Sequence, residues 1–298
     1  MYDNIEFVIC CAGICTRSYP HASAIAHKAL LPMGDIRLID YVLHDIVKSG
    51  GRHISIVCSN QKVIDDFKNA LSSNYDVVKK LRNKGKTDIA DITEKTFLPE
   101  DLDLKFFIQK EALGTAHVIY VARKGIQNRH VVLIFPDDIL ISRDPENPLM
   151  HRLIETFLKN PKTALLTGMY CEDVSSYAII ENNRVVEKPK HPSNHLAGLD
   201  PNILPREMIA FLIKQAPKRL KQARETGKEW IYIDALNEFL DKEGEQQGFG
   251  VKIFEKDEED DLIDTGSLFL YEQAFLKMLL KYSHFKKSHQ QLARKLLP

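Results

Sequence analysis

The sequence predicts an α/β fold in which helices flank a mixed, mainly parallel sheet, and three features indicate this. The first expected strand, residues 7–12, is a continuous apolar run, which is typical of a strand buried on both faces. A polar loop follows, and then apolar residues recur at helical spacing over 38–48. A second apolar strand occupies 54–58. This β–loop–α–β order is typical of doubly wound sheets.

The rest of the chain continues the alternation. Gly50 and Gly51 end the first helix. Residues 82–103 are polar with weak periodicity, which predicts irregular or short helical structure. Further strands are expected at 104–108, 131–135, 163–169 and 251–254, with a hairpin of 177–180 and 184–187 around two asparagines. Further helices are expected at 64–71, 116–122, 149–158, 209–220, 233–240, 269–280 and 289–297.

Charge and composition exclude several classes of protein. The 298 residues include 41 Lys and Arg against 41 Asp and Glu, whereas nucleic-acid and membrane-surface proteins favour an excess of positive charge. No apolar run approaches the roughly 20 residues that span a bilayer, and the acidic start does not resemble a signal peptide. The five cysteines form no Cys-x-x-Cys pair, which favours reduced thiols. We therefore expect a cytoplasmic protein with no nucleic-acid or membrane partner.

The loop after the first strand lies where open α/β sheets bind ligands. It begins at Ala12 and Gly13, and a glycine lets backbone N–H groups approach a phosphate closely. Thr16 offers a hydroxyl, Arg17 a bidentate fork and Lys28 a second cation. The loop lacks the glycine patterns of P-loops and dinucleotide sites. By itself, it is equally compatible with an ordinary turn that carries a surface arginine.

Two acidic segments are candidates for a magnesium site. Asp137 and Asp138 come directly after the strand at 131–135, and Asp264 lies between a short apolar pair and Gly266. Mg²⁺ is typically bound by one or two carboxylates together with substrate phosphates. The alternative is that these carboxylates only cap the loops that follow them.

A further pair of charged residues ends the expected hairpin. Glu187 can accept hydrogen bonds from sugar hydroxyls, and Lys188 can hold a phosphate as a point charge. Taken alone, a Glu-Lys pair before proline is most often a solvated strand end. Its meaning therefore depends on the motifs around it.

These motifs occur in a specific order along the chain. They are Gly-x-x-Thr-Arg, Lys-x-x-Leu-Pro, Gln-x-x-x-x-Gly-Thr-Ala-His, Pro-Asp-Asp, Glu-Lys-Pro and Asp-Thr-Gly-Ser. The order resembles the sugar-nucleotide pyrophosphorylases, and among them the bacterial UTP–glucose-1-phosphate uridylyltransferases, from about residue 5 to the C-terminus. The resemblance implies a three-layer, Rossmann-like nucleotidyltransferase fold of the glycosyltransferase-A type. It implies one domain over 1–298, with a nucleotide-binding half at about 1–140, a sugar-binding part at about 141–268 and a helical segment at about 269–298.

The resemblance also implies a reaction and a role for each motif. UTP and glucose 1-phosphate would give UDP-glucose and pyrophosphate, by Mg²⁺-assisted in-line attack of the sugar phosphate on the UTP α-phosphate. The implied nucleotide-binding residues are Ala12, Gly13, Thr16, Gln109 and Gly114. The implied sugar-binding residues are Ala178, Glu187 and Lys188, and the implied metal ligands are Asp137 and Asp264. The implied catalytic cations are Arg17, Lys28 and Lys188. A homodimer or homotetramer is the implied assembly.

The sequence departs from the family pattern at several positions. Cys15 stands where the family loop has a second glycine, Ala178 where the family has glycine beside the sugar, and Leu268 where it has lysine. The stretch 194–205 is about two residues longer than in the family. Two alternatives therefore stay open: the same chemistry on another nucleotide or sugar phosphate, and a low-activity or inactive paralogue that binds nucleotide. Because the acidic and basic residues of the motifs are present, we expect an active enzyme.

Overall fold

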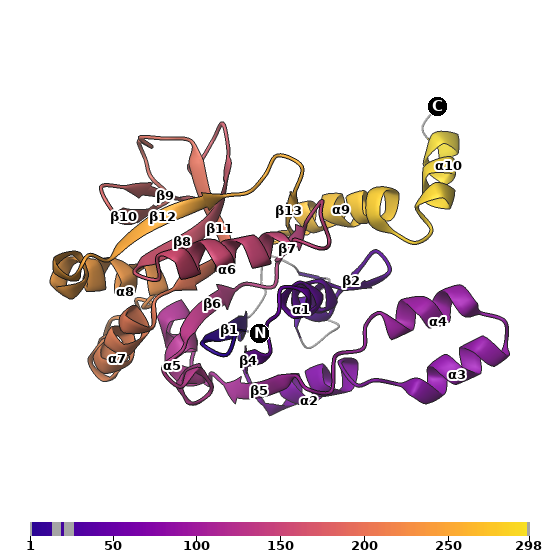
Figure 1. Cartoon of the computed structure of the whole chain (residues 1–298), viewed down its shortest axis with the longest axis horizontal. Helices are drawn as coiled ribbons and strands as arrows, with labels where there is room; N and C mark the ends of the chain where they lie inside the picture. Colours follow the sequence, from indigo (N-terminus) through magenta and orange to yellow (C-terminus); the bar gives the residue numbers. More distant parts are fainter. Residues whose placement is uncertain (1, 14–18, 21–26, 297–298) are drawn as a thin grey trace.

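The computed structural model describes residues 2–13, 19–20 and 27–296, and its centre is a mixed sheet flanked by helices (Figure 1). Within these residues the sheet has nine strands. Four strands from the first half of the chain run parallel to one another: β1 (Ile5–Cys11), β4 (His53–Cys58), β5 (Asp103–Ile108) and β6 (His130–Ile134). All four were expected from their apolar runs, and the predicted fold class is confirmed.

The second half of the chain extends this sheet with antiparallel pairs. β11 (Leu196–Leu204) pairs with β6 on one side and with β8 (Thr163–Tyr170) on the other. β12 (Gly250–Glu255) runs parallel to β8. The hairpin of β9 (Ala178–Glu181) and β10 (Arg184–Glu187) joins through β11, as the two asparagines between its strands predicted.

The sequence did not predict β11, although it is the strand that joins the two halves. Its middle contains Gly198, Asp200 and Pro201, residue types that are depleted in strands. The structure accommodates them with an irregularity between Leu199 and Asn202, where the register against β8 shifts. The strand therefore bends at Asp200, which bears on the site described below.

Two short antiparallel pairs lie outside the main sheet. β7 (Asp138–Ile141) pairs with β13 (Asp261–Asp264), and β2 (Pro32–Met33) pairs with β3 (Ile36–Arg37). The β7–β13 pair brings together segments that are more than a hundred residues apart in the sequence. Its register sets Asp264 opposite Asp138.

Helices cover both faces of the sheet. In chain order the α-helices are α1 (Leu38–Lys48), α2 (Gln61–Ala70), α3 (Tyr75–Asn83), α4 (Thr87–Glu94), α5 (Thr115–Ile126), α6 (Leu149–Lys159), α7 (Arg206–Thr226), α8 (Tyr232–Phe239), α9 (Leu268–Lys277) and α10 (Lys286–Leu296). The side chain of Asn60 starts α2 by accepting from Val63 N, and Gly227 ends α7 in the left-handed conformation. The polar stretch expected to be irregular or short helical contains part of α3 and the whole of α4.

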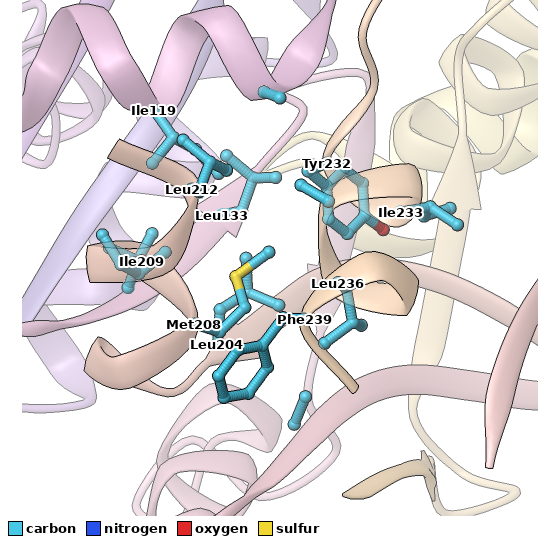
Figure 2. Close-up of a cluster of buried hydrophobic side chains, with 14 of the residues drawn as sticks. Ile119, Leu133, Leu204, Met208, Ile209, Leu212, Tyr232, Ile233, Leu236 and Phe239 are labelled. Carbon is cyan, nitrogen blue, oxygen red and sulfur yellow. The ribbon is translucent and has the colours of Figure 1, made fainter. Parts of the chain in front are cut away.

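The hydrophobic core has two main parts, one on each face of the sheet. Alternate residues of β1 face opposite sides, with Val8 on one side and Phe7 and Ile9 on the other. The first part packs α5, α7 and α8 against the sheet (Figure 2), and the second packs α1, α2 and α6. Burying each large aliphatic side chain contributes roughly 1.5–3 kcal/mol to the free energy of unfolding. The two helix layers therefore stabilise the sheet. No helix in the described part of the chain is long and apolar enough to cross a bilayer.

Candidate active site

A cleft of about 350 Å³ lies at the carboxyl end of β6 and is lined by residues from both halves of the chain. The lining residues include Asp137, Asp138, Tyr177, Ala178, Glu187, Lys188, Asp200, Asn202, Tyr232 and Asp264. Cavities of about 410 Å³ and 590 Å³ lie elsewhere, but neither contains any of the predicted site residues. The cleft is therefore the candidate active site.

Hydrogen bonds from the loop after β13 hold the two acids that the sequence singled out as metal ligands. Thr265 donates to the carbonyl oxygen of Asp137 through both its backbone N (2.8 Å) and its Oγ1 (2.7 Å). Gly266 N donates to Asp264 Oδ1 at 2.6 Å. The loop after β13 is thus attached to the end of β6, and the structure brings Asp137 and Asp264 together as the sequence predicted.

Gly266 leaves a small space between these carboxylates. A Cβ added at Gly266 would lie 2.8 Å from Asp264 Oδ1 and 3.4 Å from Asp137 Oδ2. The two oxygens therefore surround one point that only a glycine keeps open. Hard oxygen ligands around such a space fit Mg²⁺, which needs only one or two carboxylates when phosphates and water complete its shell. Among the described residues, no group of three or more His, Cys, Asp or Glu forms a larger metal site.

Lys28 lies next to Asp137, although it is not among the residues that line the cleft. Its Nζ forms an ion pair with Asp137 Oδ2, and the two side chains are only 14% and 16% exposed. The short turn Lys28–Leu30 that carries it is capped by His27, whose Nδ1 accepts from Ala29 N at 3.1 Å. Burial lowers the pKa of His27 to about 4, which keeps it a neutral acceptor. The predicted cation thus lies beside a predicted metal ligand.

Two further acids, Asp138 and Asp200, also line the cleft. Burial, followed by repulsion from neighbouring carboxylates, raises the pKa of Asp138 and of Asp200 well above the usual range. The backbone N–H of Asp200 donates to the Asp138 carboxylate, and Asn202 Nδ2 donates to Asp200 Oδ1. Asn202 Nδ2 also donates to Tyr232 Oη at 2.9 Å. The Asp-Pro step inside the longer segment was the signal in the sequence, but its strand was not recognised.

The predicted sugar-binding residues lie on the β9–β10 hairpin. Glu187 is directly opposite Ala178, which is itself opposite Gly198 of β11. Lys188 adopts a φ of +46° and its N–H donates to the carbonyl oxygen of Tyr177 at 2.8 Å. A non-glycine residue in the left-handed region is held there by its surroundings and is a frequent feature of functional sites.

The predicted base-binding residues lie beside the cleft rather than in its lining. Gln109 is buried, and its Nε2 donates to the carbonyl oxygen of Gly114 at 3.1 Å. Gly114 has a φ of +103°, and a Cβ there would lie no more than 2.7 Å from three backbone atoms of Trp230. Thr115, the next residue, lines the cleft and its Oγ1 accepts from Tyr232 N at 2.9 Å.

The remaining predicted residues belong to the first loop. Ala12 is buried at the end of β1, and Gly13 is exposed. Thr16, Arg17 and the departure at Cys15 lie outside the described residues. The arrangement that the structure does describe combines the carboxylates of Asp137 and Asp264 with the Glu187–Lys188 end of a hairpin in one cleft, and Lys28 is paired with Asp137. This combination suits the transfer of a phosphate-containing group.

Comparison with known proteins agrees with this assignment. The sequence pattern of the family described as "Nucleotidyl transferase" matches residues 7–238, most of the chain. The chain belongs to the nucleotidyl transferase family. It is 31% identical to UTP–glucose-1-phosphate uridylyltransferase 2 of Staphylococcus saprophyticus, over 70% of this chain and 74% of that one. It is 28% identical to the UTP–glucose-1-phosphate uridylyltransferase of Streptococcus pneumoniae, over 77% and 79% of the two chains.

A solved structure shares the fold over almost the whole chain. The UTP-bound UDP-glucose pyrophosphorylase of Acinetobacter baumannii superimposes with a TM-score of 0.78, covering 98% of this chain and 99% of that one at 21% identity. The resemblance drawn from the motif order is confirmed at the level of family and fold. Nucleotidyl transfer, of the type catalysed by the uridylyltransferases, is therefore the activity class of this chain.

Proposed function

We propose that the protein makes UDP-glucose and pyrophosphate from UTP and glucose 1-phosphate with the help of Mg²⁺. The observation that carries this proposal is the juxtaposition of Asp137, Asp264 and the Gly266 space with the Glu187–Lys188 hairpin end in one cleft. The names of the relatives support the choice of substrates, as does the UTP bound in the Acinetobacter enzyme.

The proposed reaction needs no nucleophile from the protein. The phosphate oxygen of glucose 1-phosphate is already anionic, so it can attack the α-phosphorus of UTP in line while pyrophosphate leaves. The main task of the protein is to hold two polyanions together against their repulsion. Bound Mg²⁺ would supply charge neutralisation at the phosphates, and Asp137 and Asp264 would hold it.

We assign the other residues by the charge and hydrogen-bonding capacity of their side chains. Lys28, beside Asp137, neutralises charge on the triphosphate, and Lys188 holds the sugar phosphate. Glu187 accepts from sugar hydroxyls next to Ala178. Gln109 and Gly114 contact the uracil, with Ala12 and Gly13 against the base and ribose. Thr16 and Arg17 bind the triphosphate.

The proposal also includes the organisation of the chain. It comprises a nucleotide-binding half at about 1–140, a sugar-binding part at about 141–268 and a helical segment at about 269–298. We propose a cytoplasmic homodimer or homotetramer. Exposed apolar side chains on α9 and α10, among them Phe269, Leu276, Leu292 and Leu296, support self-association.

Pyrophosphate release tests the function directly. The protein is incubated with Mg²⁺, glucose 1-phosphate and, in separate reactions, UTP, dTTP, CTP, ATP or GTP. Turnover should be highest with UTP. It should be absent in Asp137→Ala and unchanged in Asp144→Ala, which removes an exposed acid outside the cleft.

Two other outcomes would replace the proposal. Higher turnover with another nucleotide would retain the chemistry and change the substrate. Folded protein that binds UTP but turns over with no nucleotide would indicate a paralogue without activity.

A further inference from the structure

A cavity of about 590 Å³ lies away from the active-site cleft and contains none of the residues proposed for the reaction. Its lining comes from three elements labelled in Figure 1: α1, the end of α4 and the segment between α9 and α10. A smaller cavity of about 270 Å³ shares five of these lining residues and adjoins it. The larger cavity, called the α1 groove below, has the size of a small-molecule site.

Three aromatic side chains line the α1 groove, each from a different part of the chain. Tyr41 lies on α1, Phe97 follows α4, and Tyr282 lies between α9 and α10. All three are partly exposed, and Ile36 and Ile92 add apolar surface beside them. Nucleic-acid bases stack on aromatic side chains of this kind, because every base has a flat face. The groove therefore suits a ligand with a planar ring.

Two lysines of the groove form no ion pair with any described residue. Lys48 ends α1 and Lys95 follows α4, and both side chains are exposed. The acids nearest to Lys95 along α4 are Asp91 and Glu94, and both are paired with Arg82 instead. Both ammonium groups are therefore available to a ligand, and lysine holds a phosphate as a point charge.

The acids that line the two cavities do not offset these lysines. Both oxygens of Asp35 accept hydrogen bonds from the chain itself, from Ser283 Oγ at 2.7 Å and from His284 N at 2.5 Å. Asp45 lines the adjoining cavity, and burial raises its pKa to about 7, so that it is only partly charged at neutral pH. A surplus of positive charge remains in the α1 groove, and it favours an anionic ligand.

A nucleoside phosphate combines the two properties that the groove requires, since its base is planar and its phosphate is negatively charged. We propose that the α1 groove is a second binding site, which takes a nucleoside phosphate with its base against the aromatic side chains and its phosphate at Lys48 and Lys95. The inference goes beyond the proposed function and does not depend on it, because no residue of the groove takes part in the reaction.

Fluorine NMR of protein that contains 3-fluorotyrosine tests the inference. Tyr41 and Tyr282 report on the α1 groove, while Tyr177 and Tyr232 line the cleft and report on the active site in the same spectrum. Each resonance is assigned by a Tyr→Phe substitution. The protein is titrated with AMP and with UMP in the absence of Mg²⁺, and with adenosine, uridine and inorganic phosphate as the separate parts of these ligands.

AMP, UMP or both should shift the resonances of Tyr41 and Tyr282 with saturation, and the isolated nucleosides and phosphate should bind about tenfold more weakly or less. The double variant Lys48→Gln, Lys95→Gln should weaken nucleotide binding at the groove by about tenfold or more and leave the resonances of Tyr177 and Tyr232 unchanged. Lys124→Gln with Lys159→Gln, at exposed positions on α5 and α6, is the matched control and should bind as the wild type does.

Three results would overturn the inference. Millimolar nucleotide that shifts only Tyr177 and Tyr232 would confine binding to the active site. Undiminished shifts of Tyr41 and Tyr282 in the Lys48→Gln, Lys95→Gln variant would show that the lysines hold no phosphate. Inorganic phosphate that binds as tightly as AMP and UMP would show that the aromatic side chains contact no base.

Discussion

The proposed base side, next to the cleft, and the proposed sugar side, in its lining, are built in different ways. On the base side, the main chain of Trp230 brackets Gly114: Trp230 N donates to Leu113 O at 2.9 Å, and Ala116 N donates to Trp230 O at 3.1 Å. On the sugar side, most of the polar groups are side chains, among them Asp138, Asp200 and Glu187.

This difference predicts which kind of substitution should change substrate recognition on each side. A wall formed by main-chain atoms tolerates many side-chain substitutions. It does not tolerate a Cβ at a position where two main-chain segments are in contact. A wall built of side chains can change its preference through single substitutions with little effect on the fold. We therefore expect base recognition to depend on a few glycines and buried anchors, and sugar recognition to depend on individual carboxylates.

The largest effect should come from Asp137 and Asp264, the proposed metal ligands. Asp137→Ala and Asp264→Ala should each reduce turnover by about a thousandfold or more, because charge neutralisation at the phosphates is lost. Both should weaken Mn²⁺ binding, measured by electron paramagnetic resonance, to a similar extent. Retention of wild-type Mn²⁺ affinity by either variant would contradict the assignment of that residue.

The second effect concerns His27, whose bond to Ala29 N anchors the turn of Lys28. The pKa of His27 is lowered to about 4 in the folded chain, so the unfolded chain binds the proton first as the pH falls. The free energy of unfolding should therefore decrease between about pH 6.5 and pH 4, by on the order of 3 kcal/mol.

Urea unfolding at pH 7.5 and pH 5 measures this effect. His27→Gln keeps an acceptor but cannot titrate, so it should lose less stability on acidification than the wild type. His191→Gln, at an exposed position, should behave like the wild type. Equal acid sensitivity of His27→Gln and the wild type would show that His27 is not a buried neutral group.

Gly114→Ala should damage the base side selectively. The new Cβ would meet the Trp230 backbone, so the loop must shift and KM for UTP should rise about tenfold, with a smaller change for the sugar phosphate. Gly85→Ala is a matched control, since Gly85 also has a positive φ but its Cβ would meet nothing within 4 Å among the described residues. If both variants bind UTP equally well, contact with Trp230 is not what positions the loop.

The sequence predicted the strands that consist of continuous apolar runs, which are β1, β4, β5 and β6. The strand that joins the halves, β11, was missed because a bend at Asp200 and Pro201 interrupts its pattern. That Asp137 and Asp264 lie close together was expected from the resemblance carried by the order of the motifs. The packing of Trp230 on Gly114 could not be predicted, because it depends on a contact between residues more than a hundred positions apart.

The smallest effect should come from Ala178, where the family has glycine. Its side chain is buried opposite Glu187 in the hairpin, so its methyl already fits the wall. Ala178→Gly should change KM for the sugar phosphate by about threefold or less, at a cost to stability of roughly 1 kcal/mol. A gain of tenfold or more in kcat/KM would mean that the methyl obstructs the sugar.

The most direct test of nucleotidyl transfer follows the phosphorus atoms themselves. The protein is incubated with UTP, glucose 1-phosphate and Mg²⁺, and the mixture is followed by ³¹P NMR. The proposed function predicts that the two substrates disappear in equal amounts as UDP-glucose and pyrophosphate form in equal amounts. Conversion of UTP to UDP and phosphate with glucose 1-phosphate left intact would contradict it, as would no reaction from protein that binds both substrates.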